Sequence, residues 1–213
     1  MKIITYSLIL AATLSSFTLA QPHDYSHSSM QMQHNTQGIS SNILQSMHKP
    51  MMENSAMKSG SADKDFLSNM MPHHQGAILS SKALLEVPNL DPKIREIAQN
   101  IITTQEEEIE LFTSLLNTES FSQTSNKKAY ENFHNASQKA MNSMMKEMNK
   151  VYDDNPQKTF LTGMIPHHQG AIAASEEILK VTNNTTIKKI ANAIIQAQKQ
   201  EIAEMENLLK GME

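Results

Sequence analysis

Apolar residues recur every three or four positions along most of this chain, and this spacing predicts an all-helical protein. Between Phe66 and Leu85 two neighbouring stripes follow the helical period, so this helix should be buried over a wide face. The sequence Val-Pro-Asn at 87–89 ends it. The stripes consist of Phe66, Met70, His73, Ala77 and Leu84, and of Leu67, Met71, His74, Ile78 and Leu85.

A second helix should begin after Asp91, because an aspartate before Pro92 combines an N-cap with a proline in the first turn. Its apolar stripe, which includes Ile94, Ile97 and Ile101, continues to about Asn117. The two helices should therefore form a hairpin.

This hairpin is duplicated. Residues 69–78, with the sequence N-M-M-P-H-H-Q-G-A-I, return at 163–172 as G-M-I-P-H-H-Q-G-A-I, an offset of 94 positions (Phe160 minus Phe66). Asn155 before Pro156 starts the second copy, whose helices should run to about Val181 and from about Thr185. Two hairpins with short connections predict a four-helix bundle in which the two Pro-His-His-Gln helices meet near a pseudo-twofold axis.

A methionine-rich helix is expected before each hairpin. The duplicated domain should span residues 43–213, with the first repeat at about 43–117 and the second at about 126–210. Met47 and Met51 correspond to Met141 and Met145 at the same offset of 94.

The first 20 residues predict export, and residues 21–42 predict a polar tail. Lys2, an apolar run from Ile3 to about Leu14 and small residues up to Ala20 are typical of a signal peptide, residues 1–20, cleaved before Gln21. We therefore expect a periplasmic protein with no membrane span after cleavage, because the run is too short to cross a bilayer. Residues 21–42 are polar and rich in His and Met, so we expect a disordered tail, either a loose metal-collecting segment or a linker.

Composition narrows the chemistry. A net charge of −4 provides no electrostatic footprint for nucleic acid, so no nucleic-acid partner is expected. The chain has no cysteine, so apolar helices must hold the fold without disulfides. It has 16 methionines, which can serve as flexible core fillers or as soft sulfur ligands.

The duplicated strings combine thioethers with imidazoles. Met70 stands three residues before His73 and four before His74, so one helical turn brings its sulfur beside both rings. This donor set favours copper, and in particular Cu(I). A proline inside each helix should bend its axis, unless it marks the helix start. The second copy of the site consists of Met164, His167 and His168, and the prolines are Pro72 and Pro166.

Further candidate ligands lie in the preceding helices. Four methionines at i, i+3, i+4 and i+7 form a thioether stripe on an otherwise polar helix, which either packs on the bundle or presents sulfur to copper. They are Met141, Met144, Met145 and Met148, and the first half has Met47, His48 and Met51 in the matching segment.

The last helix of each repeat interrupts its apolar stripe with polar residues. A buried amide needs partners, and imidazole N–H groups of the facing helix are the nearest. We expect these residues to orient the histidines, although the glutamates equally fit the edge of a solvated face. They are Gln105 with Glu108, and Gln198 with Glu201.

The pattern F-L-x-x-M-x-P-H-H-Q-G-A-I, followed by I-x-x-I-A-x-x-I-I-x-x-Q-x-x-E-I, closely resembles the CopM-type periplasmic copper-binding proteins, a bacterial family long described only as a domain of unknown function. The resemblance covers about Ala62 to Leu209. It implies a ferritin-like bundle and a role in copper tolerance as a metallochaperone or sequestering protein. Met205 matches a methionine typical of that family, and Phe112 stands in its place in the first half.

Three other functions compete with a non-catalytic copper binder. A ferritin-like di-metal enzyme would use carboxylates and Glu-x-x-His motifs, and the sequence contains no Glu-x-x-His. A metal-free adaptor would use its Met-rich helix as a pliable docking surface, and a four-histidine zinc site would ignore the methionines. We favour a protein that is not an enzyme and that holds Cu(I) or passes it to a periplasmic copper exporter or acceptor protein.

Overall fold

The computed structural model describes the backbone of residues 25–212 and the side chains of residues 38–212. The predicted signal peptide lies outside this range. Within it the chain forms helices and connecting loops without a strand, as the periodicity predicts. The six helices are α1 (Tyr25–Glu53), α2 (Ala62–Leu85), α3 (Pro92–Thr118), α4 (Lys127–Met148), α5 (Pro156–Leu179) and α6 (Thr185–Lys210).

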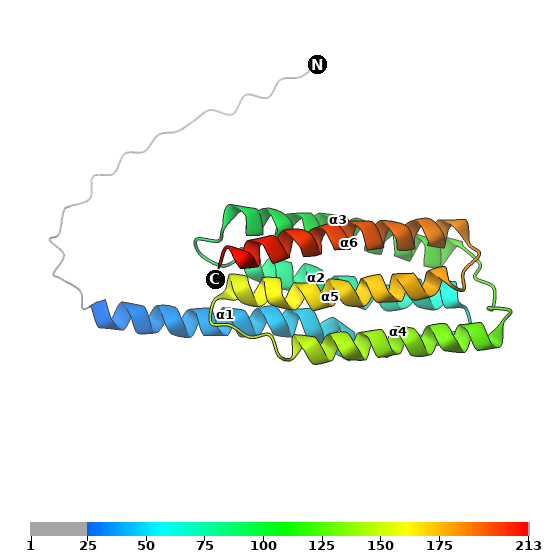
Figure 1. Cartoon of the computed structure of the whole chain (residues 1–213), viewed down its shortest axis with the longest axis horizontal. Coiled ribbons are helices and arrows are strands. Elements are labelled where there is room, and N and C mark those ends of the chain that lie inside the picture. Colours follow the sequence, from blue (N-terminus) through cyan, green and yellow to red (C-terminus); the bar gives the residue numbers. More distant parts are fainter. Residues whose placement is uncertain (1–24, 213) are drawn as a thin grey trace, which may run out of the picture.

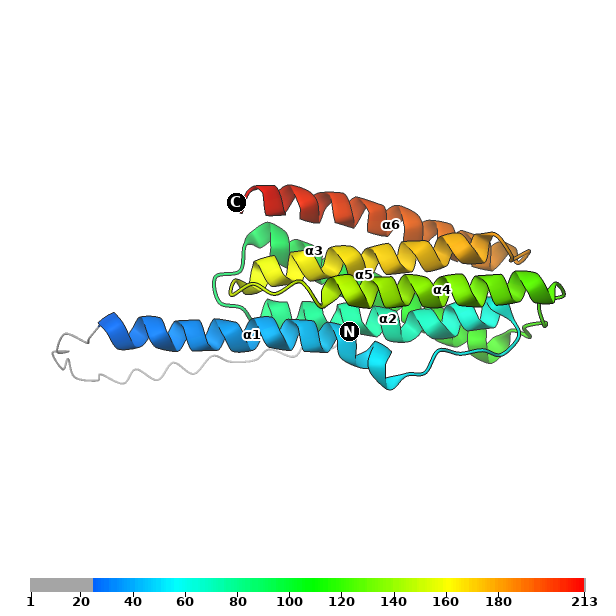
Figure 2. The same ribbon diagram turned by 60° about the horizontal axis from the view of Figure 1, so that its bottom comes forward.

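The helices form a bundle of three layers with α2 and α5 in the middle (Figure 1). Helices α3 and α6 cover one face of this central pair, and α1 and α4 cover the opposite face, as Figure 2 also shows from a second direction. Helices α2 and α5 run in opposite directions, and so do α1 and α4 (Figure 1). The central helices are therefore buried on two faces, which explains their wide apolar stripes.

Local sequence signals set the helix boundaries. The side chains of Asp91 and Asn155 accept hydrogen bonds from first-turn amides of α3 and α5, and proline follows each, which confirms both predicted starts. Pro72 and Pro166 lie inside α2 and α5, so the alternative in which they begin these helices is wrong.

Helix α1 differs from the expectation for residues 21–42. Its backbone is helical from Tyr25, although composition predicted a disordered tail there. The reason is that its C-terminal half packs on α2 and α5, where Ile43 and Met47 are fully buried. Once a helix is nucleated by packing, each further residue adds one backbone hydrogen bond, and the helix extends toward the N-terminus. Residues 21–24 and the side chains of residues 25–37 lie outside the described part.

The loop before α2 is fastened to α4 through a buried carboxylate. The Tyr130 hydroxyl donates a 2.6 Å hydrogen bond to Asp65 Oδ2 and accepts one from the Gly60 amide at 2.9 Å. The Ser59 amide also donates to Asp65, which has no exposed surface. Burial and then the bond to Asp65 raise the pKa of Tyr130 to about 12.

We expect Tyr130→Phe to lower the free energy of unfolding by roughly 1–3 kcal/mol, because Asp65 and the Gly60 amide each lose a buried partner. Urea unfolding measures this change. Tyr152→Phe is the control, because Tyr152 is 48% exposed and its replacement should change the free energy of unfolding by close to zero.

The folded state keeps the Tyr130 proton to about pH 12, while the unfolded chain loses it near 10.0. Stability should therefore fall as pH rises between these values, and less so in Tyr130→Phe.

Candidate metal centre

The four histidines of the duplicated string lie in the middle of the bundle. All are buried, with exposed fractions of 1% for His73 and 0% for the other three. Successive residues of a helix point about 100° apart, so the two members of each doublet face different neighbours. His73 and His167 face each other between α2 and α5, whereas His74 and His168 face α3 and α6.

His73 and His167 form a close pair of rings. Their centroids are 3.8 Å apart and the ring planes differ by 39°. Among residues 38–212, neither nitrogen of either ring has a hydrogen-bond partner. The backbone of His167 approaches the His73 ring, where it weakly favours the charged form, but it does not complete a hydrogen bond.

Both central rings are held neutral. Burial, followed by repulsion from the neighbouring histidines, lowers the pKa of His73 and of His167 well below the ordinary value for histidine. A neutral imidazole keeps a free nitrogen lone pair, which is the form that binds a metal.

The other two histidines are oriented by carboxylates. His74 Nε2 lies 2.8 Å from Glu108 Oε2, an ion-pair distance with poor hydrogen-bond angles, and His168 Nε2 forms a 2.7 Å hydrogen bond with Glu201 Oε2. In the described part of the chain, Nδ1 of both rings lacks a partner. A carboxylate on one ring nitrogen sets the orientation and raises the basicity of the other.

The predicted glutamine partners behave differently from the glutamates. Gln105 and Gln198 are each only 2% exposed, and their side-chain oxygens find no hydrogen-bond partner within residues 38–212. The polar contacts to the imidazoles come from Glu108 and Glu201. Their side chains are 18% exposed, which places them at the edge of the solvated face as well as beside the rings.

The thioethers of the two strings are buried in different core clusters. Met70 is 3% exposed and packs with Phe66 and Ala171, whereas Met164 is fully buried with Met47 and Met205. In the first half Phe112 stands 5.6 Å from His74, ring centre to ring centre, so an aromatic ring covers this histidine.

The methionine stripe of α4 packs on the bundle. Met144 and Met148 are buried, and Met141 and Met145 are half-buried against the same core cluster. Gly170, which follows the Pro-His-His-Gln string of α5, makes room for this stripe. A Cβ atom there would lie 2.7 Å from Met144 Sδ.

Helix α1 supplies residues beside His167. The Met47 carbonyl passes so close to Gly76 that a Cβ there would overlap it, and the same Cβ would lie 3.4 Å from His167 Nε2. The next residue, His48, is half-buried, its Nε2 is buried without a partner among the described residues, and burial lowers its pKa. Its charge also contributes, as the smallest cause, to the lowered pKa of His167. Met51 lies one turn further on and is half-buried.

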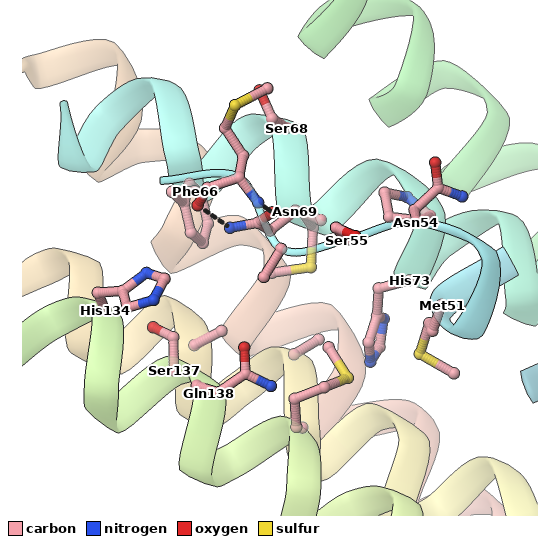
Figure 3. A pocket seen from close by; sticks show the side chains of 18 of the residues that line it. Met51, Asn54, Ser55, Phe66, Ser68, Asn69, His73, His134, Ser137 and Gln138 are labelled. Carbon is pink, nitrogen blue, oxygen red and sulfur yellow. Dashed lines mark hydrogen bonds between the residues drawn. The ribbon is translucent and has the colours of Figure 1, made fainter. Parts of the chain in front are cut away.

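A pocket of about 270 Å³ opens beside His73 between α1, α2, α4 and α5 (Figure 3). It contains two residues that sequence analysis missed, His134 and Ser137. The available signal was their position: they stand seven and four residues before Met141, on one face of α4.

The described residues contain no group of three or more His, Asp or Glu side chains placed to hold one ion. An ion at the histidines would therefore draw on two imidazoles or on imidazole with thioether. No helix in the described range is both long and apolar enough to cross a membrane.

Fold and site define an internally duplicated, all-helical protein with a buried four-histidine cluster. The chain belongs to the family described as "Domain of unknown function (DUF305)", whose model matches it twice, at residues 12–116 and 63–209. It is also similar to an uncharacterised protein of Acanthamoeba polyphaga mimivirus, with 46% identity over 52 residues. That match covers 24% of this chain and 34% of the relative, about a third of its length. No solved structure is significantly similar to the present chain.

Proposed function

We propose that this protein binds copper as Cu(I) at the buried histidine and methionine cluster and serves, outside the cytoplasm, to sequester the ion or hand it over. One observation carries the proposal: the ring centroids of His73 and His167 lie 3.8 Å apart, and all four ring nitrogens lack hydrogen-bond partners in the described structure. A buried polar group without a partner costs roughly 1–3 kcal/mol. A bound cation would use these lone pairs.

The chemistry of the surroundings favours a soft, monovalent ion. Neutral imidazole and thioether are ligands of Cu(I), whereas Mg²⁺ and Ca²⁺ select oxygen. Burial of a single positive charge also costs less desolvation free energy than burial of two. Glu108 and Glu201 lie behind His74 and His168, where their negative charges offset the charge of the guest.

The competing functions use other ligands. A di-metal enzyme of the ferritin type draws on carboxylates from four helices, and here the carboxylates that contact the histidines are Glu108 and Glu201. A zinc protein would use imidazoles alone, and an adaptor protein would bind no ion. These three alternatives predict different results in one titration.

The test is a competition titration of the purified protein against a Cu(I) chelator, with metal analysis of protein isolated from copper-fed cells. We expect tight Cu(I) binding and much weaker Zn²⁺ binding. Met70→Leu with Met164→Leu keeps apolar volume but removes both sulfurs, so Cu(I) affinity should fall by roughly tenfold or more. Met52→Leu changes a 75% exposed thioether and should have no effect.

Three results would contradict the proposal. Equal Cu(I) affinity in the double variant would remove the thioethers from the site. Preferential Zn²⁺ binding would favour a four-histidine site. A melting temperature that is indifferent to Cu(I) would favour the metal-free adaptor, because a ligand bound only by the folded state must raise it.

The proposed location of the protein outside the cytoplasm is supported by the signal peptide that the first 20 residues predict. Methionine is a suitable ligand there, since it cannot be lost to disulfide formation. Exchangeable thioether and imidazole ligands also suit transfer to a receiving protein, for which a periplasmic copper exporter or acceptor protein is the expected class.

A further inference from the structure

The pocket beside His73 connects the protein surface with the central histidine pair. Its lining becomes steadily more buried: Met57 is 42% exposed, Met51 and Met141 are half-buried, Met70 is 3% exposed and His73 is 1% exposed. Figure 3 shows His73 and Met51 toward one side of the pocket and His134 toward the other. The pocket is thus lined by donors whose exposure decreases from Met57 at the surface to His73 in the core.

The lining has the chemistry of a soft-cation path. It includes four thioethers and two imidazoles, and the part of the chain that the structure describes places no carboxylate, lysine or arginine in it. The remaining polar groups are amides and hydroxyls. Thioether and imidazole attract Cu(I) without holding a hydrated divalent ion.

Two hydrogen bonds to Asn69 fix the backbone of Met57, whose side chain is the most exposed thioether in the lining of the pocket. The Met57 amide donates a 2.6 Å hydrogen bond to Asn69 Oδ1, and Asn69 Nδ2 donates one of 3.2 Å to the Met57 carbonyl. Asn69 begins the duplicated string in α2, and the matching position in α5 is Gly163, which has no side chain to form such bonds. The two halves of the protein are therefore built differently at this point.

The groups that pack against the two equivalent glycines, Gly76 and Gly170, also differ. Beside His167 the cover over Gly76 is the backbone carbonyl of Met47, which cannot move without shifting α1. Over the equivalent Gly170, which lines the pocket, the cover is the Met144 side chain. A thioether side chain has three rotatable bonds and can swing aside. His73, and not His167, lines the pocket.

We infer that the pocket is the route by which the ion reaches and leaves the histidine pair, and that Met57, Met51 and Met141 pass it inward to Met70 and His73. This inference rests on the proposed function. The duplicated site therefore has one gate, on the His73 side, with Asn69 as a positioning residue for its outer thioether.

The test is to plug the pocket without touching a proposed ligand. Ser137 lines it, and its buried hydroxyl has no hydrogen-bond partner in the described range, so Ser137→Phe adds a ring without breaking a bond. Transfer of Cu(I) from a weak chromophoric chelator is followed by stopped-flow absorbance. We expect uptake and release both to slow by roughly tenfold or more, with an unchanged dissociation constant and stoichiometry.

The control is Asn135→Phe, which adds a ring at an exposed position on the same helix and should leave the rates at wild-type values. Ala174→Leu, from α5, plugs the same pocket if Ser137→Phe folds poorly. Wild-type uptake rates in a folded plugged variant would overturn the gate while leaving the proposed function intact. A wild-type protein that takes up no Cu(I) would overturn both.

A second variant tests the path itself. Replacing Met51, Met57 and Met141 together by Leu should slow uptake and keep the number of bound ions, because these sulfurs pass the ion on. Loss of one bound equivalent would overturn the inference by making the pocket a storage site, and unchanged rates would overturn it by removing the thioethers from the path.

Discussion

Replacing His73, His74, His167 and His168 together by alanine is expected to abolish the tightest Cu(I) binding while the far-ultraviolet circular dichroism spectrum stays helical. The four rings supply the nitrogen ligands of the proposed site, whereas helix formation depends mainly on the caps and on the apolar residues that the variant keeps. Competition titration with a Cu(I) chelator measures the change. Retention of full stoichiometry would contradict the assignment of the site.

Pairwise variants should separate the two kinds of histidine. His73 and His167 lack partners on both ring nitrogens among the residues described, so their joint replacement should cost more affinity than the roughly 10–100-fold typical of an outer partner. Glu108→Gln with Glu201→Gln alters only the groups behind His74 and His168, so its cost should fall within that range. His134→Ala, which changes a ring at the pocket, should leave the dissociation constant unchanged. The opposite order of effects would exchange the roles of the two pairs.

Gly76→Ala is expected to cause the largest loss of stability among the glycine variants. Its Cβ would overlap the carbonyl oxygen of Met47, and a backbone atom moves only if α1 moves with it. Overpacking of this kind costs typically about 1–3 kcal/mol, occasionally more, and outweighs the roughly 1 kcal/mol that alanine gains over glycine within a helix. Urea unfolding measures the difference.

Gly170→Ala is the matched control, because the duplication places it at the same position of the string. Its Cβ would meet the flexible Met144 side chain, with Sδ at 2.7 Å, so that most of the strain can be relieved by a rotation. We expect a loss at least about 1 kcal/mol smaller than for Gly76→Ala. Equal losses of stability in the two variants would show that the Met47 carbonyl and the Met144 side chain are equally rigid. This result would remove one argument for a gate on the His73 side.

The helices could be predicted because their signals are local. Asp91-Pro92 and Asn155-Pro156 mark helix starts in the sequence, and the structure has α3 and α5 beginning there. The duplication is visible in the repeated string itself. The start of α1 could not be predicted in this way, since its residues up to about position 38 are polar and its helix continues from a packed segment further along the chain.

The partners of the histidines depend on distant parts of the chain. Helical spacing places Met70 near both rings of its doublet, but it does not say that His73 meets His167 while His74 turns toward Glu108. Sequence analysis based the second role on the amide of Gln105 and left Glu108 equally open as an edge residue. The rotation of α3 against α2 instead brings Glu108 within 2.8 Å of His74, and the Gln105 side-chain oxygen has no hydrogen-bond partner among the described residues. That rotation is set by side-chain packing between helices.

From the sequence alone, the helical repeats and the donor types, imidazole and thioether, were determined, because both are written in residue identity and spacing. Only the tertiary structure decided that α2 and α5 would be covered on two faces, that the rings of His73 and His167 would meet without hydrogen-bond partners, and that a pocket would open beside His73. These features depend on which surfaces pack together. The difference between Asn69 and the equivalent Gly163 has a structural effect only because the loop that contains Met57 lies beside Asn69 and forms two hydrogen bonds with its side chain.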